Sequence, residues 1–175
     1  YKVGHVNQYP AKTSHVYSNF TPRSTRRDPK PDGIIWFGLQ AWVQDFLLGQ
    51  FNEGFFKRPK AEVLDEYQRV VDNCLGLGMD ISHIGRLHDV GYLPLLIKAL
   101  PEGTLVPYRV PVLTIRNTRP EFFWLTNMLE TVMSNSLWLP TTSATTAFAY
   151  RKVFEDYAKK TGADPTFIPW QGHDF

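Results

Sequence analysis

Arginines near the N-terminus are the residues of this 175-residue chain whose type and spacing best suit binding of a charged group. Arg23, Arg26 and Arg27 lie in residues 21–33, a stretch rich in proline and charge. A guanidinium can bind two phosphate oxygens at once, so the stretch is a candidate phosphate contact. A solvated connection without a ligand is the alternative interpretation, and residue types alone favour it.

Two histidines and a cysteine are the other residues considered as metal ligands or nucleophiles. His83 and His88 are five residues apart, with Asp89 adjacent to His88. A helical metal site needs ligands three or four residues apart and a third ligand, so we expect no metal site. Cys74 lies on the apolar face of a predicted helix, which indicates a packed thiol rather than a nucleophile.

Common signatures of nucleotide binding and catalysis are missing from the sequence. It contains no G-x-G-x-x-G, no G-x-x-x-x-G-K-[ST], and no nucleophile elbow with a Ser/His/Asp order. Residue types alone therefore name no reaction. What remains is aromatic residues and arginines toward the two ends of the chain.

The elements that must position these residues are predicted from hydrophobic periodicity. Alternation predicts strands, and apolar residues three and four apart predict helices. The expected strands are 13–20, 34–37, 95–100, 105–106, 112–115 and 166–170, and the expected helices are 38–51, 59–75, 80–91, 120–136 and 143–160, with an aromatic-rich loop at 51–58. This mixed order predicts an α/β or α+β class, in one domain spanning residues 1–175.

Composition narrows the class of protein. The formal net charge is only +2, which gives no field for binding a polyanion such as nucleic acid. A single cysteine excludes an intramolecular disulfide and fits a reducing compartment. No apolar run is long enough to span a bilayer, and no signal-peptide pattern opens the chain. We therefore expect a cytoplasmic protein that binds neither membranes nor nucleic acid.

Several motifs, in order along the chain, carry a resemblance to a known family. They are YKVGH at residues 1–5, FGLQ at 37–40, the PEG turn at 101–103, PEFFWLTNMLETVMSNSLWLPTTSATT at 120–146, and HDF at 173–175. In this order and spacing, the chain resembles the nicotinamide phosphoribosyltransferases, which are type II phosphoribosyltransferases.

The resemblance implies a place in a larger fold. By this resemblance, the chain corresponds to the N-terminal α/β domain of the family, and the barrel-like domain is mostly missing from it. Residues 166–175 are expected to lead into that barrel domain, so the chain is expected to be a fragment.

The resemblance also implies an activity. The family transfers a phosphoribosyl group from phosphoribosyl pyrophosphate to nicotinamide, giving nicotinamide mononucleotide and pyrophosphate in NAD salvage. Tyr1 of one subunit and Phe175 of the other would stack on the pyridine ring, and Arg23 would contact the phosphate or pyrophosphate. The family has a second basic residue where this chain has Thr25, which is a departure from the pattern.

No catalytic residue is expected within the chain itself, because the catalytic machinery belongs to the barrel domain. We expect no tightly bound cofactor or metal; Mg²⁺ accompanies the phosphoribosyl pyrophosphate, and ATP is a further candidate ligand. The expected assembly is a homodimer with shared active sites. A nicotinate phosphoribosyltransferase, or an inactive truncated or split product that only binds or oligomerises, remains an alternative.

Overall fold

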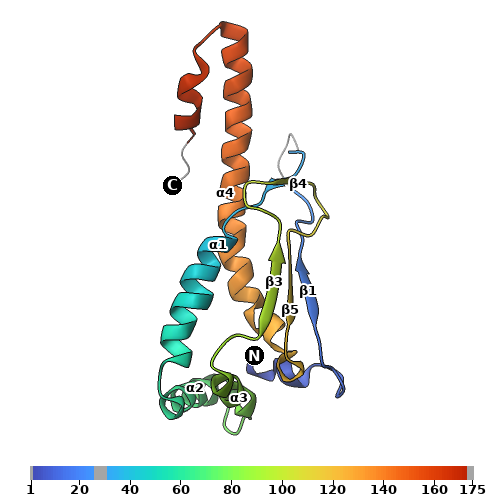
Figure 1. Cartoon of the computed structure of the whole chain (residues 1–175), viewed down its shortest axis with the longest axis vertical. Helices are drawn as coiled ribbons and strands as arrows, with labels where there is room; N and C mark the ends of the chain where they lie inside the picture. The colour runs from blue at the N-terminus through green and yellow to red at the C-terminus, as the bar shows by residue number, and fades with distance from the viewer. Residues whose placement is uncertain (1, 26–30, 173–175) are drawn as a thin grey trace.

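A computed structural model describes residues 2–25 and 31–172 (Figure 1). Its largest sheet has three antiparallel strands in the order β1-β5-β3, where β1 is Tyr17–Phe20, β5 is Leu113–Asn117 and β3 is Leu95–Ala99. A second antiparallel pair joins β2 (Ile34–Ile35) to β4 (Leu105–Val106). The mixed α/β class expected from the sequence is confirmed.

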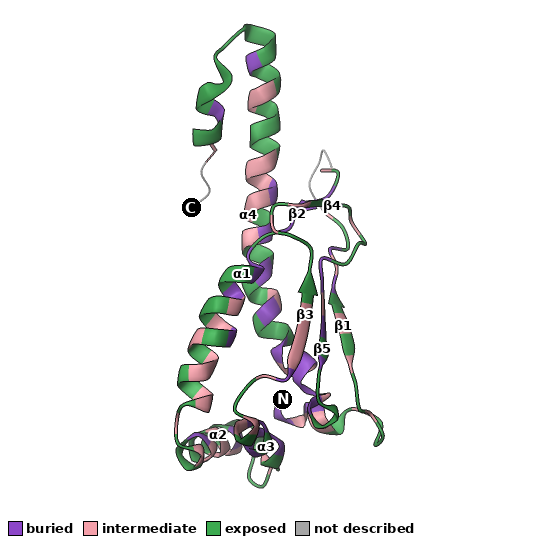
Figure 2. Cartoon of the chain, viewed as in Figure 1, coloured by how far each residue is buried: buried purple, intermediate pink, exposed green. Residues whose placement is uncertain are grey.

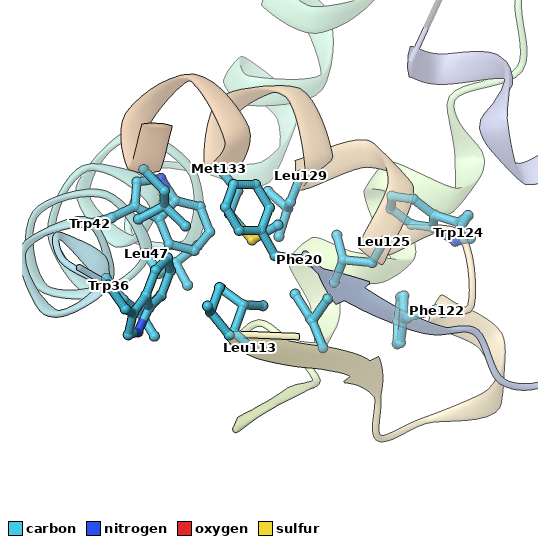
Figure 3. Packing of buried hydrophobic residues seen from close by; sticks show 14 of the residues in the cluster. Phe20, Trp36, Trp42, Leu47, Leu113, Phe122, Trp124, Leu125, Leu129 and Met133 are labelled. Carbon is cyan, nitrogen blue, oxygen red and sulfur yellow. The ribbon is translucent and has the colours of Figure 1, made fainter. Parts of the chain in front are cut away.

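The main core lies between the three-stranded sheet and the helix α4 (Leu125–Thr161). Alternate residues of β5 face this helix, so Leu113 and Ile115 are buried while Arg116 is exposed. Phe20, Leu113 and Met133 point toward one another in Figure 3, with Leu125 and Leu129 beside them. Burying each such side chain stabilises the fold by roughly 1.5–3 kcal/mol, which holds α4 against the sheet.

A run of helical segments follows the second strand. α1 (Leu39–Trp42) continues into the π-helical segments η2 (Val43–Gln50) and η3 (Asn52–Phe56), and then come α2 (Lys60–Leu75) and α3 (Ser82–Val90). The aromatic-rich loop expected at 51–58 is wrong for most of its length, since η3 is helical there. Phe51, Phe55 and Phe56 pack their rings within 5.6 Å of one another, and this contact favours a helical arrangement over an open loop.

Short 3₁₀ helices occur near both ends of the described chain and before α4. They are η1 (Lys2–Asn7), η4 (Pro120–Phe122) and η5 (Pro165–Trp170). The strand expected at 166–170 is therefore wrong. Asp164 caps η5 by accepting a hydrogen bond from the Thr166 backbone N–H at 2.9 Å, and Pro165 and Pro169 fix backbone angles that suit a helix.

One helix, α4, replaces the two helices expected on either side of Pro140. Proline removes one hydrogen bond and crowds the preceding turn, so it usually ends or kinks a helix. Here the Thr141 hydroxyl donates to the Phe37 carbonyl at 2.9 Å, and the Ile35 N–H donates to Thr145 Oγ1 at 2.9 Å. These contacts with the β2 segment hold the helix in place on the C-terminal side of the proline.

Close packing at Gly38 accompanies these hydrogen bonds. Gly38 has a φ of 106°, and a Cβ added to it would lie 2.5 Å from Pro140 Cγ. The proline ring thus occupies the space that any other residue at position 38 would fill. Gly38 is required both by its left-handed backbone and by this approach.

Cys74 is exposed, so its expected burial is wrong. The reason is that α2 buries only a narrow face, represented by Val63 and Val71, while Val70 and Leu75 of the predicted apolar face are exposed.

Across the described ranges, no helix is long and apolar enough to cross a membrane.

Candidate functional site

A pocket of about 420 Å³ lies where the end of β1 meets α4. β1 and the chain after it supply one wall, β5 contributes Ile115, and successive turns of α4 supply the opposite wall. The lining residues are Ser18, Asn19, Phe20, Thr21, Arg23, Ile115, Thr126, Asn127, Glu130, Met133, Ser134 and Trp138. The pocket thus contains Arg23, the candidate phosphate contact.

Arg23 follows a backbone that is tied down beyond the end of β1. The Val112 N–H donates to the Phe20 carbonyl at 2.9 Å, and the Arg109 N–H donates to the Pro22 carbonyl at 2.7 Å. Arg109 makes this contact with a φ of 68°, an uncommon conformation for a residue with a side chain. The Arg23 side chain is exposed and forms no ion pair with any other described residue, so its charge is available to an anion.

Polar groups of α4 line the pocket opposite this cation. Thr126 is only 3% exposed, and its hydroxyl has no hydrogen-bond partner within the described ranges. Asn127, Glu130 and Ser134 add an amide, a carboxylate and a hydroxyl. A guanidinium facing several hydrogen-bonding groups suits a ligand that carries both a phosphate and hydroxyls, such as a sugar phosphate.

The N-terminal segment reaches α4 at the same turns. The Lys2 ammonium donates to the Asn127 carbonyl at 2.9 Å. Burial raises the pKa of the Tyr9 hydroxyl, and the nearby Glu130 carboxylate raises it further. Tyr1 itself lies outside the described residues, but its neighbour Lys2 contacts one of the helical turns that line the Arg23 pocket.

The C-terminal segment contacts a distant part of the same helix. Gly172, the last described residue, packs against Tyr150 and Phe154, since a Cβ added to it would lie 3.5 Å from Tyr150 Cβ. Residues 127 and 150 are separated by about 35 Å along α4, at a rise of 1.5 Å per residue. Phe175 also lies outside the described residues. Within one copy, therefore, the segments that lead to Tyr1 and Phe175 are anchored far apart.

Comparison with known proteins shows similarity of this chain to one family. Residues 1–75 match the sequence profile described as "Nicotinamide phosphoribosyltransferase, N-terminal domain". The whole chain is 53% identical, over 180 residues, to a nicotinamide phosphoribosyltransferase of Acinetobacter baylyi, and 31% identical, over 191 residues, to one of Mycoplasma genitalium. The chain matches the N-terminal part of the nicotinamide phosphoribosyltransferases. The family resemblance seen in the sequence is thereby confirmed.

The match covers only part of those relatives. The chain spans 36% of the length of the Acinetobacter protein and 41% of that of the Mycoplasma protein. Among solved structures, human nicotinic acid phosphoribosyltransferase aligns with 87% of this chain and 27% of its own, at a TM-score of 0.61 and 20% identity. That structural likeness supports the fold class and nothing finer.

The two histidines do not form a joint site with Asp89. The His88 ring lies 3.0 Å from the Arg58 carbonyl and can donate to it, whereas His83 is 2% exposed and meets the Trp124 ring edge-on at 4.8 Å. Within residues 2–25 and 31–172, no group of three His, Cys, Asp or Glu side chains could hold a metal ion. His83 packs against Trp124, the residue just before α4.

Sequence reasoning placed Arg23 in the candidate site but missed the residues opposite it. Their signal was present: Thr126, Glu130, Ser134 and Trp138 recur every four residues and so lie along one side of the helix. Polar residues at this spacing within a largely apolar helix indicate a pocket wall. The other two predicted site residues, Tyr1 and Phe175, lie outside the described residues, so their roles stay predictions.

Proposed function

We propose that this chain forms the N-terminal part of a nicotinamide phosphoribosyltransferase. The assembled protein would transfer phosphoribosyl from phosphoribosyl pyrophosphate to nicotinamide, giving nicotinamide mononucleotide and pyrophosphate. The observation that carries the proposal is the 53% identity to the Acinetobacter enzyme across the whole of this chain. The pocket around Arg23 supports it, because it offers a free cation beside hydroxyl, amide and carboxylate groups.

In this reaction the bond between the sugar carbon and the pyrophosphate oxygen breaks, and that carbon forms a bond to the pyridine nitrogen. Pyrophosphate leaves with the electron pair, so negative charge grows at the leaving group. A fixed guanidinium near that group, or near the sugar phosphate, would stabilise the anion or hold it in register. We assign this role to Arg23. Mg²⁺ would enter with the pyrophosphate as part of the substrate complex.

Tyr1 and Phe175 would hold the base in a site shared between two copies. Offset stacking on each ring contributes about 0.5–1.5 kcal/mol beyond area burial and orients the pyridine nitrogen. The separation of about 35 Å along α4 between the anchors of the two terminal segments supports a shared site, since two copies can supply what one does not bring together. The proposed assembly is therefore a homodimer.

Steady-state kinetics on a full-length protein that begins with this chain tests the proposal. We expect nicotinamide mononucleotide to form, and Phe175→Ala to raise the KM for nicotinamide far more than the KM for phosphoribosyl pyrophosphate. Equal effects on both constants would contradict the stacking role. Turnover of nicotinate in place of nicotinamide would assign the protein to the related nicotinate activity, and no turnover of either would remove the enzyme proposal.

A further inference from the structure

The half of α4 beyond Thr145 has little protein around it. The helix extends away from the sheet there, and Figure 1 shows only the segment containing η5 running back beside it. Among the described residues after Thr145, Ala158 is the only buried position of this helix, and Figure 2 shows the same half as mostly exposed. Most helical stability in proteins comes from tertiary packing, so a helix left this open calls for a covering surface.

The exposed side chains of this helix are arranged for such a surface. Leu139 is 74% exposed, Tyr150 54%, Val153 51% and Tyr157 61%. At about 100° per residue, these four and Val132 fall within an arc of about 60° on the helix. We call these five residues the α4 stripe. Residues 150, 153 and 157 are three and four apart, the spacing by which one helix presents a seam to another.

The stripe continues beside a hollow nearer the core. Val132 also lines a pocket of about 520 Å³, whose other walls include Phe37, Trp42 and Phe46. The rings of Trp42 and Phe46 are stacked at 5.8 Å, so this wall is preformed and aromatic. A helix lying along α4 would meet this aromatic hollow at one end and Tyr157 at the other.

We propose that an amphipathic helix from the part of the protein that this chain does not span docks along the α4 stripe. This inference rests on the proposed function. Its occupant follows from the comparisons: the Acinetobacter relative matches this chain throughout, yet the match covers only 36% of that relative. The remainder of such a protein supplies the occupant, and the stripe is a largely exposed row of apolar and aromatic side chains on the longest described helix, where Gly172 touches Tyr150 and Lys160 lies 5.0 Å from the Tyr157 ring.

The test is reconstitution from two polypeptides. This chain is co-expressed with a tagged polypeptide comprising the part of the Acinetobacter enzyme that lies outside the match, and the amount of chain retained on the tag is measured. We expect retention of the unchanged chain, and a loss of more than about tenfold with Val153→Lys combined with Tyr157→Lys, because the two lysines would place charge in the proposed apolar contact.

Asp156→Lys is the matched control, since it lies about 100° around the helix from Tyr157 and forms no ion pair within residues 2–25 and 31–172. Circular dichroism of each variant checks that α4 still forms. Failure of the unchanged chain to be retained, or equal retention of the stripe variant and the control, would overturn the proposal. So would a dimer of this chain alone that the stripe variant disrupts, because it would assign the stripe to a second copy.

The outcome is separable from that of the proposed function. Formation of nicotinamide mononucleotide is assayed on the same purified complexes. A stripe-dependent complex without activity would leave the docking inference standing and count against the enzyme proposal. An active complex that retains the stripe variant as well as the control would support the enzyme proposal and overturn the docking inference.

Discussion

The position of Arg23 is fixed by backbone hydrogen bonds of the residues before it, and not by contacts of its own side chain. Hydrogen bonds at Phe20 and Pro22 fix the backbone just before it, and the guanidinium is left exposed at the pocket. A side chain held in this way can serve a ligand without first breaking an ion pair. Its replacement should therefore affect binding more than folding.

For Arg23→Ala in the full-length protein, we expect the KM for phosphoribosyl pyrophosphate to rise about 10- to 100-fold, with a small effect on the KM for nicotinamide. A hydrogen bond to a charged group contributes roughly 1.5–3 kcal/mol, which gives this range. Arg23→Lys should recover part of the loss, because it keeps the charge but not the two-point geometry. Arg116→Ala, at an exposed arginine of β5, is the control, and an equal effect there would contradict the assignment.

His83 makes the stability of the chain depend on pH. Burial lowers its pKa from the usual 6.5, the Asp80 carboxylate opposes this, and Arg86 lowers it further. The unfolded chain therefore takes up a proton near pH 6.5 while the folded chain resists it. The free energy of unfolding should be steady well above pH 6.5 and fall as the pH drops from there toward the lower folded pKa.

Urea unfolding at pH values of about 7.5 and about 5.5 would measure this loss. His83→Phe keeps an aromatic ring beside Trp124 and should reduce the difference between the two pH values. Some dependence should persist, because burial and the charge of Lys2 also lower the pKa of His5, although Glu130 opposes them. An unchanged difference in His83→Phe would show that this histidine is not a source of the effect.

At the scale of single residues, the sequence predicted the cation of the site and missed its surroundings. Composition indicated only the basic, proline-rich stretch 21–33, and the family resemblance singled out Arg23 within it; Arg23 lines the pocket, and its role stays a prediction. Thr126, Glu130 and Ser134 were missed because the apolar periodicity of their helix dominated its interpretation. Cys74 was misplaced for a related reason, since an apolar face predicts burial only where another element covers it.

Helix α4 is the element where a local rule and the tertiary contacts disagree. Pro140 predicts a break, but the Thr141 and Thr145 hydroxyls bond to the chain at Phe37 and Ile35, and the proline ring fits the space at Gly38. These contacts involve residues about a hundred positions apart. Local sequence patterns do not reveal such long-range contacts. The prediction of two helices was therefore wrong, although Pro140 by itself favours a break.

Gly38→Ala should destabilise the chain more than Gly103→Ala. Both glycines have positive φ, so each alanine suffers the left-handed penalty of roughly 1–2 kcal/mol. Only at Gly38 would the added Cβ also meet a side chain, at 2.5 Å from Pro140 Cγ, whereas nothing lies within 4 Å at Gly103. Thermal or urea unfolding of the two variants measures the difference.

Combining Gly38→Ala with Pro140→Ala separates the two causes. Removing the proline ring should restore the stability that Gly38→Ala loses through the clash with Pro140. The loss caused by the positive φ at position 38 should remain. Equal destabilisation by Gly38→Ala and Gly103→Ala would mean that the proline ring yields freely to the new methyl group.

The other element-scale errors have similar origins. Phe51 and Phe55 are four residues apart, which is a helical spacing, and the rings of this segment pack on one another in the π-helical η3. The segment 165–170 carries β-compatible residues, but its two prolines and the Asp164 cap select a 3₁₀ helix. In contrast, α2 was predicted to within one residue and α3 to within two, because each is followed by a glycine.

On the scale of the whole molecule, the proposed site is divided between segments anchored at two distant parts of α4. The N-terminal segment packs near Asn127 and the C-terminal segment near Tyr150. A shared site predicts complementation between two defective copies. Full-length Tyr1→Ala and Phe175→Ala proteins should each be nearly inactive at limiting nicotinamide, and a mixture of the two should regain activity.

The expected recovery is about a quarter of the unmutated activity. With random exchange in a two-fold symmetric dimer, about half of the dimers are mixed, and one of the two sites in each mixed dimer has both aromatic rings intact. Mixing must include a step that lets subunits exchange, and each protein mixed with itself is the control. Absence of any recovery after proven exchange would show that both rings come from the same copy.

The exposure of Cys74 offers a direct way to count molecules in these assemblies. It is the sole thiol of the 175 residues and lies on the outside of α2, away from the α4 stripe and the Arg23 pocket. A maleimide dye would attach once to each copy of the 175-residue chain without any engineered handle. Photobleaching steps in a single particle would then report how many copies it holds.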